Sequence, residues 1–149
     1  MKTLFIVLTT LFLTCTISMA ADGLVTKTSA HNVKQTMDNL EKIVKSKGFN
    51  VAARINHAAA AATVKAALRP TEVLIFGKPK LGTKLMQSSQ TIGIDLPIKV
   101  IVWQEADGTV KLGYNDPDWL ASRHSITDKK PVFEKMKGAL KKITDAAVK

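Results

Sequence analysis

Hydrophobic and polar residues alternate along the chain with the periods of helices and strands. Residues 32–47 and 132–148 carry apolar side chains at spacings of three and four, which is typical of amphipathic helices. The first helix is expected to end at Gly48, a common helix terminator. The apolar stripes consist of Val33, Met37, Leu40 and Val44 in the first helix and of Phe133, Met136, Leu140, Ile143 and Ala147 in the second.

Shorter apolar runs predict strands. Residues 24–26 and 49–55 are rich in β-forming residues, and residues 73–76 form a continuous apolar run, as expected of a strand covered on both faces or buried centrally. Residues 98–103 and 109–114 flank Asp107-Gly108, which predicts a β-hairpin.

The remaining segments predict shorter helices and a loop. Asn56 is placed to cap a helix over residues 58–68, whose seven alanines would let it approach a sheet closely. Residues 77–82 predict a loop, which leads into a short helical segment through Leu85 and Met86. Residues 117–124 predict a further short helix.

The order of these elements predicts one α+β domain, an α/β two-layer arrangement with a mixed β-sheet and helices packed against it. A chain of 149 residues has room for about one such domain. We expect it over residues 21–149, with a basic helix over residues 132–148. Its 46% hydrophobic and 23% charged residues exclude intrinsic disorder.

The N-terminus has the pattern of a secretory signal peptide over residues 1–20. Lys2 supplies the positive charge, an apolar stretch follows, and small residues precede a cleavage point after Ala20. An uncleaved membrane anchor over residues 3–21 is the alternative, which five threonines and the lack of a following basic cluster disfavour. Cleavage predicts a periplasmic or secreted protein with no transmembrane anchor. It also removes the only cysteine, which excludes disulfides and thiol chemistry.

The formal net charge of +10 suggests an anionic partner. Residues 128–149 hold seven lysines against three acidic residues, a pattern that suits anionic lipid, an acidic partner or simply a solvated helix face. Export and an aromatic content of 5% argue against nucleic acid as a partner.

The loop over residues 77–84 is like a phosphate-binding loop with its last two residues exchanged, which excludes nucleotide hydrolysis. It leaves an anion site near Gly82, or solvated lysines, at Lys78, Lys80 and Lys84.

Histidines and carboxylates offer little evidence of chemistry. His31, beside the start of the first helix, can serve as a cap, and the histidines and methionines lack metal-ligand spacing, so no cofactor is predicted. Only His57 with Met86 remains a possible copper or haem pair. Glu72 is expected to form a salt bridge with Arg69 that closes one end of the sheet.

Several segments together resemble the bacterial domain-of-unknown-function family 302. The resemblance runs from about residue 26 to residue 124, and it departs from the family at Lys78, where asparagine is usual. It implies a small, often exported, dimeric α/β domain with no established activity. The segments are residues 57–61, 68–72, 76–86, 95–99, Trp103 before Asp107-Gly108, and 114–117.

These observations favour an exported accessory protein, expected to be a homodimer, that binds a small ligand, with an anion as one candidate, or a protein partner. One alternative is a hydrolase or isomerase with His57 as base and Glu72 as its partner, and another is a copper or haem carrier. A fourth reading is that these residues only close a turn and shape a dimer interface. The candidate ligand-binding residues are His57, Glu72, Lys78, Gly82, Thr83 and Met86, with no catalytic residue assigned.

Overall fold

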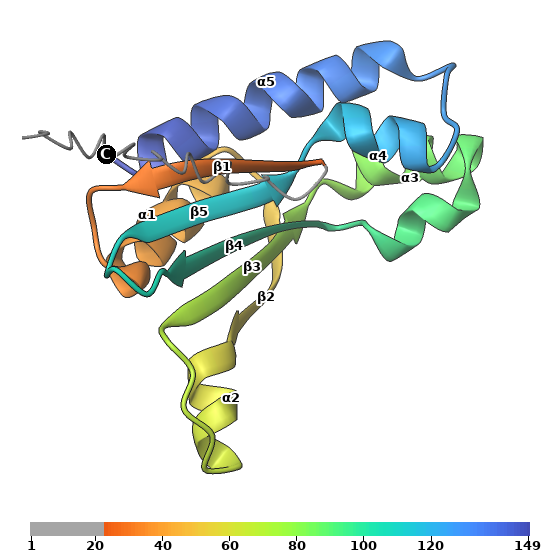
Figure 1. Cartoon of the computed structure of the whole chain (residues 1–149). Helices are drawn as coiled ribbons and strands as arrows, with labels where there is room; N and C mark the ends of the chain where they lie inside the picture. Colours follow the sequence, from red (N-terminus) through yellow and green to blue (C-terminus); the bar gives the residue numbers. More distant parts are fainter. Residues whose placement is uncertain (1–22) are drawn as a thin grey trace, which may run out of the picture.

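A computed structural model describes residues 23–149, which form an α+β domain with one five-stranded sheet (Figure 1). The strands are β1 (Leu24–Ser29), β2 (Asn50–Asn56), β3 (Thr71–Gly77), β4 (Ile98–Gln104) and β5 (Val110–Asn115), in the order β1-β5-β4-β3-β2. The helices are α1 (Val33–Ser46), α2 (His57–Thr63), α3 (Pro79–Ser88), the 3-10 helix η1 (Gln90–Ile94), α4 (Pro117–Arg123) and α5 (Lys130–Ala147). The single α+β domain is therefore confirmed.

The sheet is antiparallel throughout, so the predicted mixture of parallel and antiparallel strands is wrong. Helix α1 carries the chain from one edge of the sheet to the other, and β1 pairs with β5 instead of β2. Helix α2 joins two neighbouring antiparallel strands, β2 and β3. The hairpin of β4 and β5 around Asp107-Gly108 is confirmed, with Gly108 at φ +86°.

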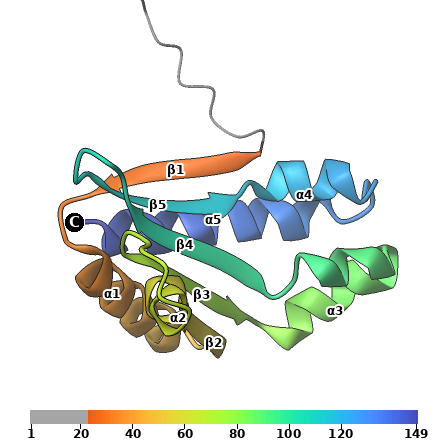
Figure 2. The same ribbon diagram turned by 60° about the horizontal axis from the view of Figure 1, so that its bottom comes forward.

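Among the described residues, helices α1 and α5 cover one face of the sheet, and no helix covers the other (Figures 1 and 2). Along β3 the side chains alternate between buried and half-buried, because Leu74 and Phe76 face the helices and Val73 and Ile75 face the other way. Of the two expectations for this strand, cover on both faces is wrong, whereas a central position is confirmed, because β3 lies inside the sheet between β4 and β2. The covered face and its helices build one core, whose largest fully buried side chains include Phe76, Met37, Leu40, Leu74, Leu112 and Ile143.

Local capping explains the bounds of α1. The Asn32 side chain accepts a hydrogen bond of 2.8 Å from the Gln35 amide, so Asn32, and not His31, caps this helix. Gly48 follows the C-cap with φ +67°, a conformation that favours glycine. Helix α3 starts at Pro79, so residues 79–82, expected in a loop, are helical; proline suits the first turn of a helix.

Helix α2 differs most from its prediction. It ends at Thr63, five residues earlier than expected, and Lys65 beyond it takes a positive φ of 58°. None of its residues is buried, so the alanines do not pack on the sheet; the helix projects from one end of the domain (Figure 1).

The predicted signal peptide of residues 1–20 lies outside the described residues. Within residues 23–149, no helix combines the length and the apolar character that a bilayer span requires.

Candidate functional site

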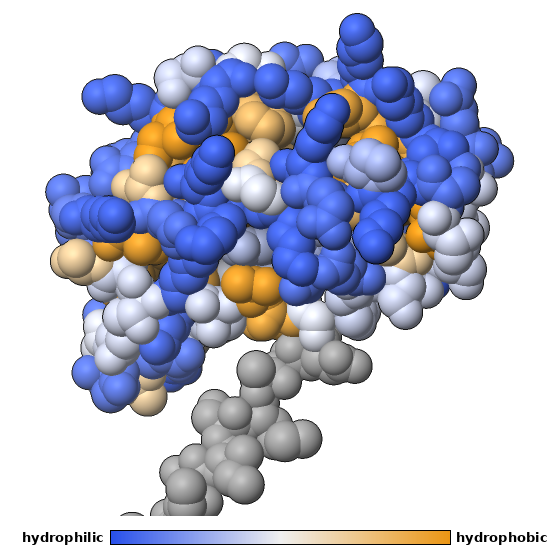
Figure 3. All heavy atoms as spheres, turned by 90° about the horizontal axis from the view of Figure 1, so that it is seen from above, coloured by the Kyte–Doolittle hydropathy of each residue, from blue (hydrophilic) through white to orange (hydrophobic). Residues whose placement is uncertain are grey.

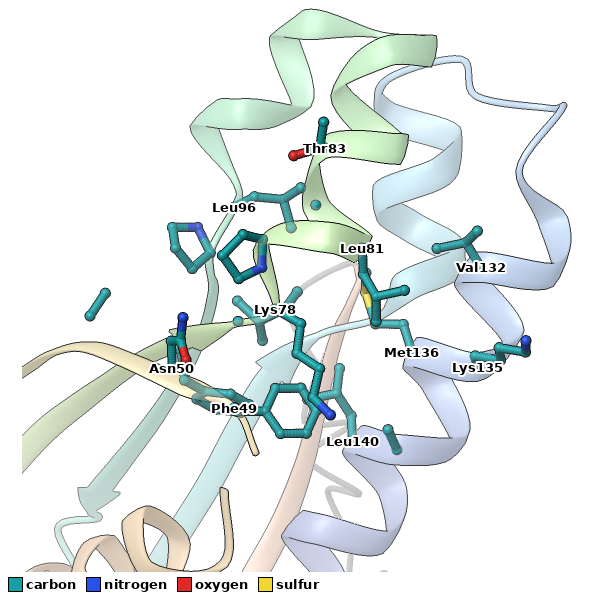
Figure 4. A pocket seen from close by; sticks show the side chains of 18 of the residues that line it. Phe49, Asn50, Lys78, Leu81, Thr83, Leu96, Val132, Lys135, Met136 and Leu140 are labelled. Atoms are coloured by element: carbon teal, nitrogen blue, oxygen red, sulfur yellow. The ribbon is translucent and has the colours of Figure 1, made fainter. Parts of the chain in front are cut away.

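An apolar cavity of about 410 Å³ lies between α5, the first turns of α3 and the adjoining ends of β2, β3 and β4 (Figure 4). Its size falls within the range of about 300–1,000 Å³ that is usual for small-molecule sites. Aliphatic and aromatic side chains from these elements make up most of the lining. The principal ones are Phe49, Phe76, Leu81, Met86, Leu96, Ile98, Val132, Met136, Leu140 and Ile143.

Two aromatic rings form a rigid part of the wall. Phe76 is fully buried at the end of β3, and Phe49 packs its ring edge-on against it, with centroids 5.5 Å apart and an interplanar angle of 88°. Edge-to-face pairs contribute about 0.5–1.5 kcal/mol beyond the burial of their area. This side of the cavity is thus held by packing that needs no ligand.

Two lysines stand where the cavity meets solvent. The ammonium of Lys78 lies 4.6 Å from the centroid of the Phe49 ring, a cation–π geometry, and Lys135 comes from α5 (Figure 4). Among residues 23–149 neither lysine forms an ion pair, and no aspartate or glutamate lines the cavity. The cavity therefore combines an apolar interior with cations that no carboxylate balances.

Four of the six candidate residues, Lys78, Gly82, Thr83 and Met86, line this cavity. The other two, His57 and Glu72, lie at the opposite end of β3 and are not part of it. Glu72 and Gly77 lie five positions apart along the extended strand, about 16 Å at about 3.3 Å per residue. The expected single cluster is therefore two separate places.

Glu72 is held by Arg54 of β2, not by Arg69, so the predicted salt bridge is wrong about the partner. Arg54 donates from Nε to Glu72 at 2.7 Å and from a second nitrogen to Asp38 at 2.6 Å and to Glu41 at 3.2 Å. Arg69 instead donates to the backbone carbonyl of Gln104. The antiparallel pairing of β2 with β3, which the sequence did not predict, determines this choice.

The four groups form a charged network that ties α1 to the sheet. Burial lowers the pKa of Arg54, but its hydrogen bonds to the three carboxylates outweigh this and raise it. The pKa of Asp38 is lowered by hydrogen bonds from Lys34 and then Arg54, and that of Glu41 mainly by Lys45 with a further contribution from Arg54. Asp38, Glu41 and Arg54 are therefore charged at neutral pH, and the buried side chain of Glu72, 7% exposed, has Arg54 as its partner.

The sequence of this chain matches a known protein family. The sequence profile described as domain of unknown function DUF302 matches residues 25–143, most of the chain. The chain belongs to the DUF302 family. This confirms the resemblance drawn from residues 26–124 and extends it into α5, which forms one wall of the cavity.

Curated relatives contain the same domain in longer chains. The DUF302 chain is 47% identical over 109 residues to proteins named fluoride-specific ion channel FluC 1 from Brucella suis and from Brucella abortus. The match covers 73% of this chain but 43% and 40% of those proteins, respectively. The chain therefore spans about two fifths of the length of these relatives.

A solved structure supports the fold. An uncharacterized conserved DUF302 protein from Bacillus stearothermophilus superposes with a TM-score of 0.68 at 22% identity, covering 86% of this chain and 97% of the other. At this identity the likeness concerns the arrangement of helices and strands alone.

The structure does not bring the suggested metal pair of the DUF302 chain together. His57 begins α2, which precedes β3, whereas Met86 lies in α3 beyond the other end of that strand (Figure 1). Among residues 23–149 no group of three or more His, Cys, Asp or Glu side chains is placed to hold a metal ion. Lys80 and Lys84 are exposed on α3 and do not line the cavity, so Lys78 is the one member of the expected anion site that does.

His124 is a residue whose contacts the sequence did not suggest. Its Nε2 lies 2.6 Å from an oxygen of Asp95, and its Nδ1 lies 3.1 Å from the hydroxyl of Thr91. Arg123 approaches the same carboxylate at 3.3 Å. These contacts join η1 to the end of α4, and we assign them a structural role.

The sequence also missed the contribution of α5 to the cavity. Met136 is expected on the core stripe of this helix, and Lys135 is one of the seven lysines expected to face lipid, an acidic partner or solvent, yet both line the cavity. The signal that could have found them is the run of Val132, Lys135, Met136 and Ala139, which places a lysine at the edge of the apolar stripe.

Proposed function

We propose that this DUF302 chain is an exported accessory protein that binds a small ligand in the cavity between α3 and α5 and acts as a homodimer. The observation that carries the proposal is the cavity itself, which is large enough for a small molecule and contains four of the residues that the sequence singled out. Export rests on the signal-peptide pattern of residues 1–20.

The dimer is supported by apolar surface on the other side of the sheet. Ile55, Val73 and Ile101 are neighbours across three strands on the face that no helix of residues 23–149 covers. Ile55 is 39% exposed, and Val64 and Leu68, which follow α2, are 74% and 49% exposed. Contiguous apolar surface of this kind favours a protein partner, and a second copy of the chain offers the same complementary face.

The relatives are compatible with an accessory role. In the proteins named fluoride-specific ion channels the DUF302 region is one part of a longer chain, as expected of a module that serves another domain. Fluoride is therefore a second candidate ligand, to be tested beside small organic molecules.

The first test is native mass spectrometry of the protein purified from its host without refolding. We expect a chain shortened by 20 residues, present as a dimer and carrying a reproducible additional mass. The variant Ala139→Phe, which fills the cavity from α5, should lose that mass, whereas Ala146→Phe, an exposed alanine of the same helix, should retain it. Retention of the mass by Ala139→Phe would place the ligand elsewhere and contradict the proposed site.

The dimer is tested separately by the mass of the assembly. Ile55→Lys places a charge on the open face and should give monomers. Ile94→Lys is the matched control, because Ile94 is 70% exposed in η1, away from that face. A wild-type monomer, or an Ile55→Lys dimer, would argue against self-association through this surface.

A fluoride titration monitored by ¹⁹F NMR tests the second candidate ligand, fluoride.

A further inference from the structure

We propose that the cavity selects a single-chain amphiphile with one anionic head group, such as a medium-chain carboxylate. The inference rests on the proposed function, small-ligand binding in this cavity, and adds the chemical class of the ligand. Three properties of the site carry it: its apolar lining, its uncompensated lysines and its volume.

The lining specifies an apolar body. Branched aliphatic side chains, the two phenylalanines and the flexible thioethers of Met86 and Met136 surround the space. Asn50 and Thr83 are the polar uncharged side chains in the lining. A ligand rich in hydroxyl or amide groups would leave most of them without hydrogen-bond partners, at about 1–3 kcal/mol for each buried group. An alkyl chain leaves none unpaired, and methionine adapts readily to its shape.

The charges specify an anionic head. Lys78 and Lys135 lie at the boundary of the cavity, and a neighbouring hollow shares Lys135 and adds Lys47 and Lys142. Within residues 23–149 none of these four lysines forms an ion pair, whereas Lys137 and Lys141, also on α5, pair with Asp118 and Asp145. Two cations at the cavity and two more in the adjoining hollow together create a positive potential that attracts an anion and repels a cation.

The contact between Lys78 and Phe49 positions one of these cations. The ring face attracts the ammonium without neutralising its charge, so the donor remains available to a carboxylate. A charge-assisted hydrogen bond from such a donor contributes enough to change affinity by about tenfold.

The volume limits the length of the chain. If each non-hydrogen group occupies about 30 Å³, as a water molecule does in the liquid, 410 Å³ accommodates about 14 of them. Decanoate, with ten carbons and two oxygens, is of this size and is therefore a suitable probe.

The test is isothermal titration calorimetry of the purified protein with three ten-carbon probes: sodium decanoate, 1-decanol and decyltrimethylammonium. We expect decanoate to bind at least tenfold more tightly than either of the others. Lys78→Met and Lys135→Met should each weaken decanoate binding by about tenfold and leave decanol binding unchanged. Lys84→Met is the matched control, since Lys84 is an exposed lysine of α3 outside the cavity, and it should bind decanoate like the wild type.

The outcomes separate this inference from the proposed function. If decanol binds as tightly as decanoate and Ala139→Phe abolishes both, the cavity binds ligands but the selection of anions is wrong. If no probe binds, both proposals fail for this class of molecule. Decanoate binding that is unaffected by Ala139→Phe would place it outside the cavity and overturn the inference. Binding only to phosphatidylglycerol vesicles, with none to free decanoate, would assign the lysines to a membrane surface and overturn it as well.

Discussion

The two ends of β3 treat charge in opposite ways. At the start of the strand the buried carboxylate of Glu72 is held by Arg54, which also binds Asp38 and Glu41 of α1. Beyond its end Lys78 and Lys135 border an apolar cavity with no acidic residue in its lining. In the first arrangement the charges pair with one another and hold α1 on the sheet. In the second the lysines are unpaired within the described chain and are available to a ligand.

The difference shows why charged residues near one strand should not be taken as one site. Charged and polar side chains are also common on the surface as a whole. Seen from the α5 side, hydrophilic residues dominate and smaller apolar patches lie between them (Figure 3). A cation becomes informative about function only where the residues around it provide no partner.

The largest expected effect is at the paired end. Arg54→Met leaves Glu72 buried without a cation, and we expect it to lower the free energy of unfolding by about 3 kcal/mol, the lower part of the range for broken buried pairs because Arg54 is partly exposed. Urea denaturation measures this. Arg54→Lys keeps the charge and should lose less. A change below about 1 kcal/mol in Arg54→Met would mean that the network is not a support of the fold.

At the cavity end the support is aromatic. Phe49→Ala removes the edge-on contact with Phe76 and should cost about 2 kcal/mol of unfolding free energy, less than a fully buried phenylalanine because Phe49 is half-buried. Phe49→Leu keeps apolar bulk and should cost about half as much. Equal losses in the two variants, measured by urea denaturation, would show that the ring geometry matters more than its volume.

Acid should weaken the paired end of the strand. Asp38 and Glu41 have lowered pKa values in the fold, below their ordinary 3.8 and 4.5, so the stability they contribute is present above these values and is lost as the pH falls below them. We therefore expect the urea midpoint to decrease progressively from about pH 4.5 downwards. Arg54→Met, which removes one cause of both shifts, should show a shallower decrease. An identical profile in the variant would assign the acid sensitivity to carboxylates elsewhere.

The smallest effect is expected for the cavity lysines. Lys78→Met and Lys135→Met remove charges that have no ionic partner within the described chain, so the free energy of unfolding should change by less than about 0.5 kcal/mol. A slight gain is compatible, because separating like charges relieves repulsion. A loss above 1 kcal/mol, measured by urea denaturation in low salt, would show that these lysines support the fold and would remove the contrast between the two ends.

The sequence predicted the parts of the fold that depend on local pattern. The amphipathic stripes of α1 and α5 and the Asp107-Gly108 hairpin are confirmed because residues a few positions apart determine them. The order of the strands depends on α1, which connects β1 at one edge of the sheet with β2 at the other. The partner of Glu72 depends on the pairing of β2 with β3. Neither is encoded in a short segment.

The same distinction explains what could be predicted of the site. Lys78, Gly82, Thr83 and Met86 lie within nine consecutive residues, so a dense local motif was enough to find them. Lys135 and Met136 come from a helix more than 45 residues later, and only the folded chain brings them to the same cavity.

The pairing of β1 with β5 has a consequence for how the chain becomes folded. Leu24 pairs with Asn115, so the first strand to be synthesised waits for the last, about 90 residues later. During this time β1 is an unpaired segment in which threonines alternate with Val25 and Lys27. Its lysine and its scarcity of large apolar residues disfavour premature pairing of β1 with another chain. Because β1 pairs with β5, the sheet is complete only when most of the polypeptide is present.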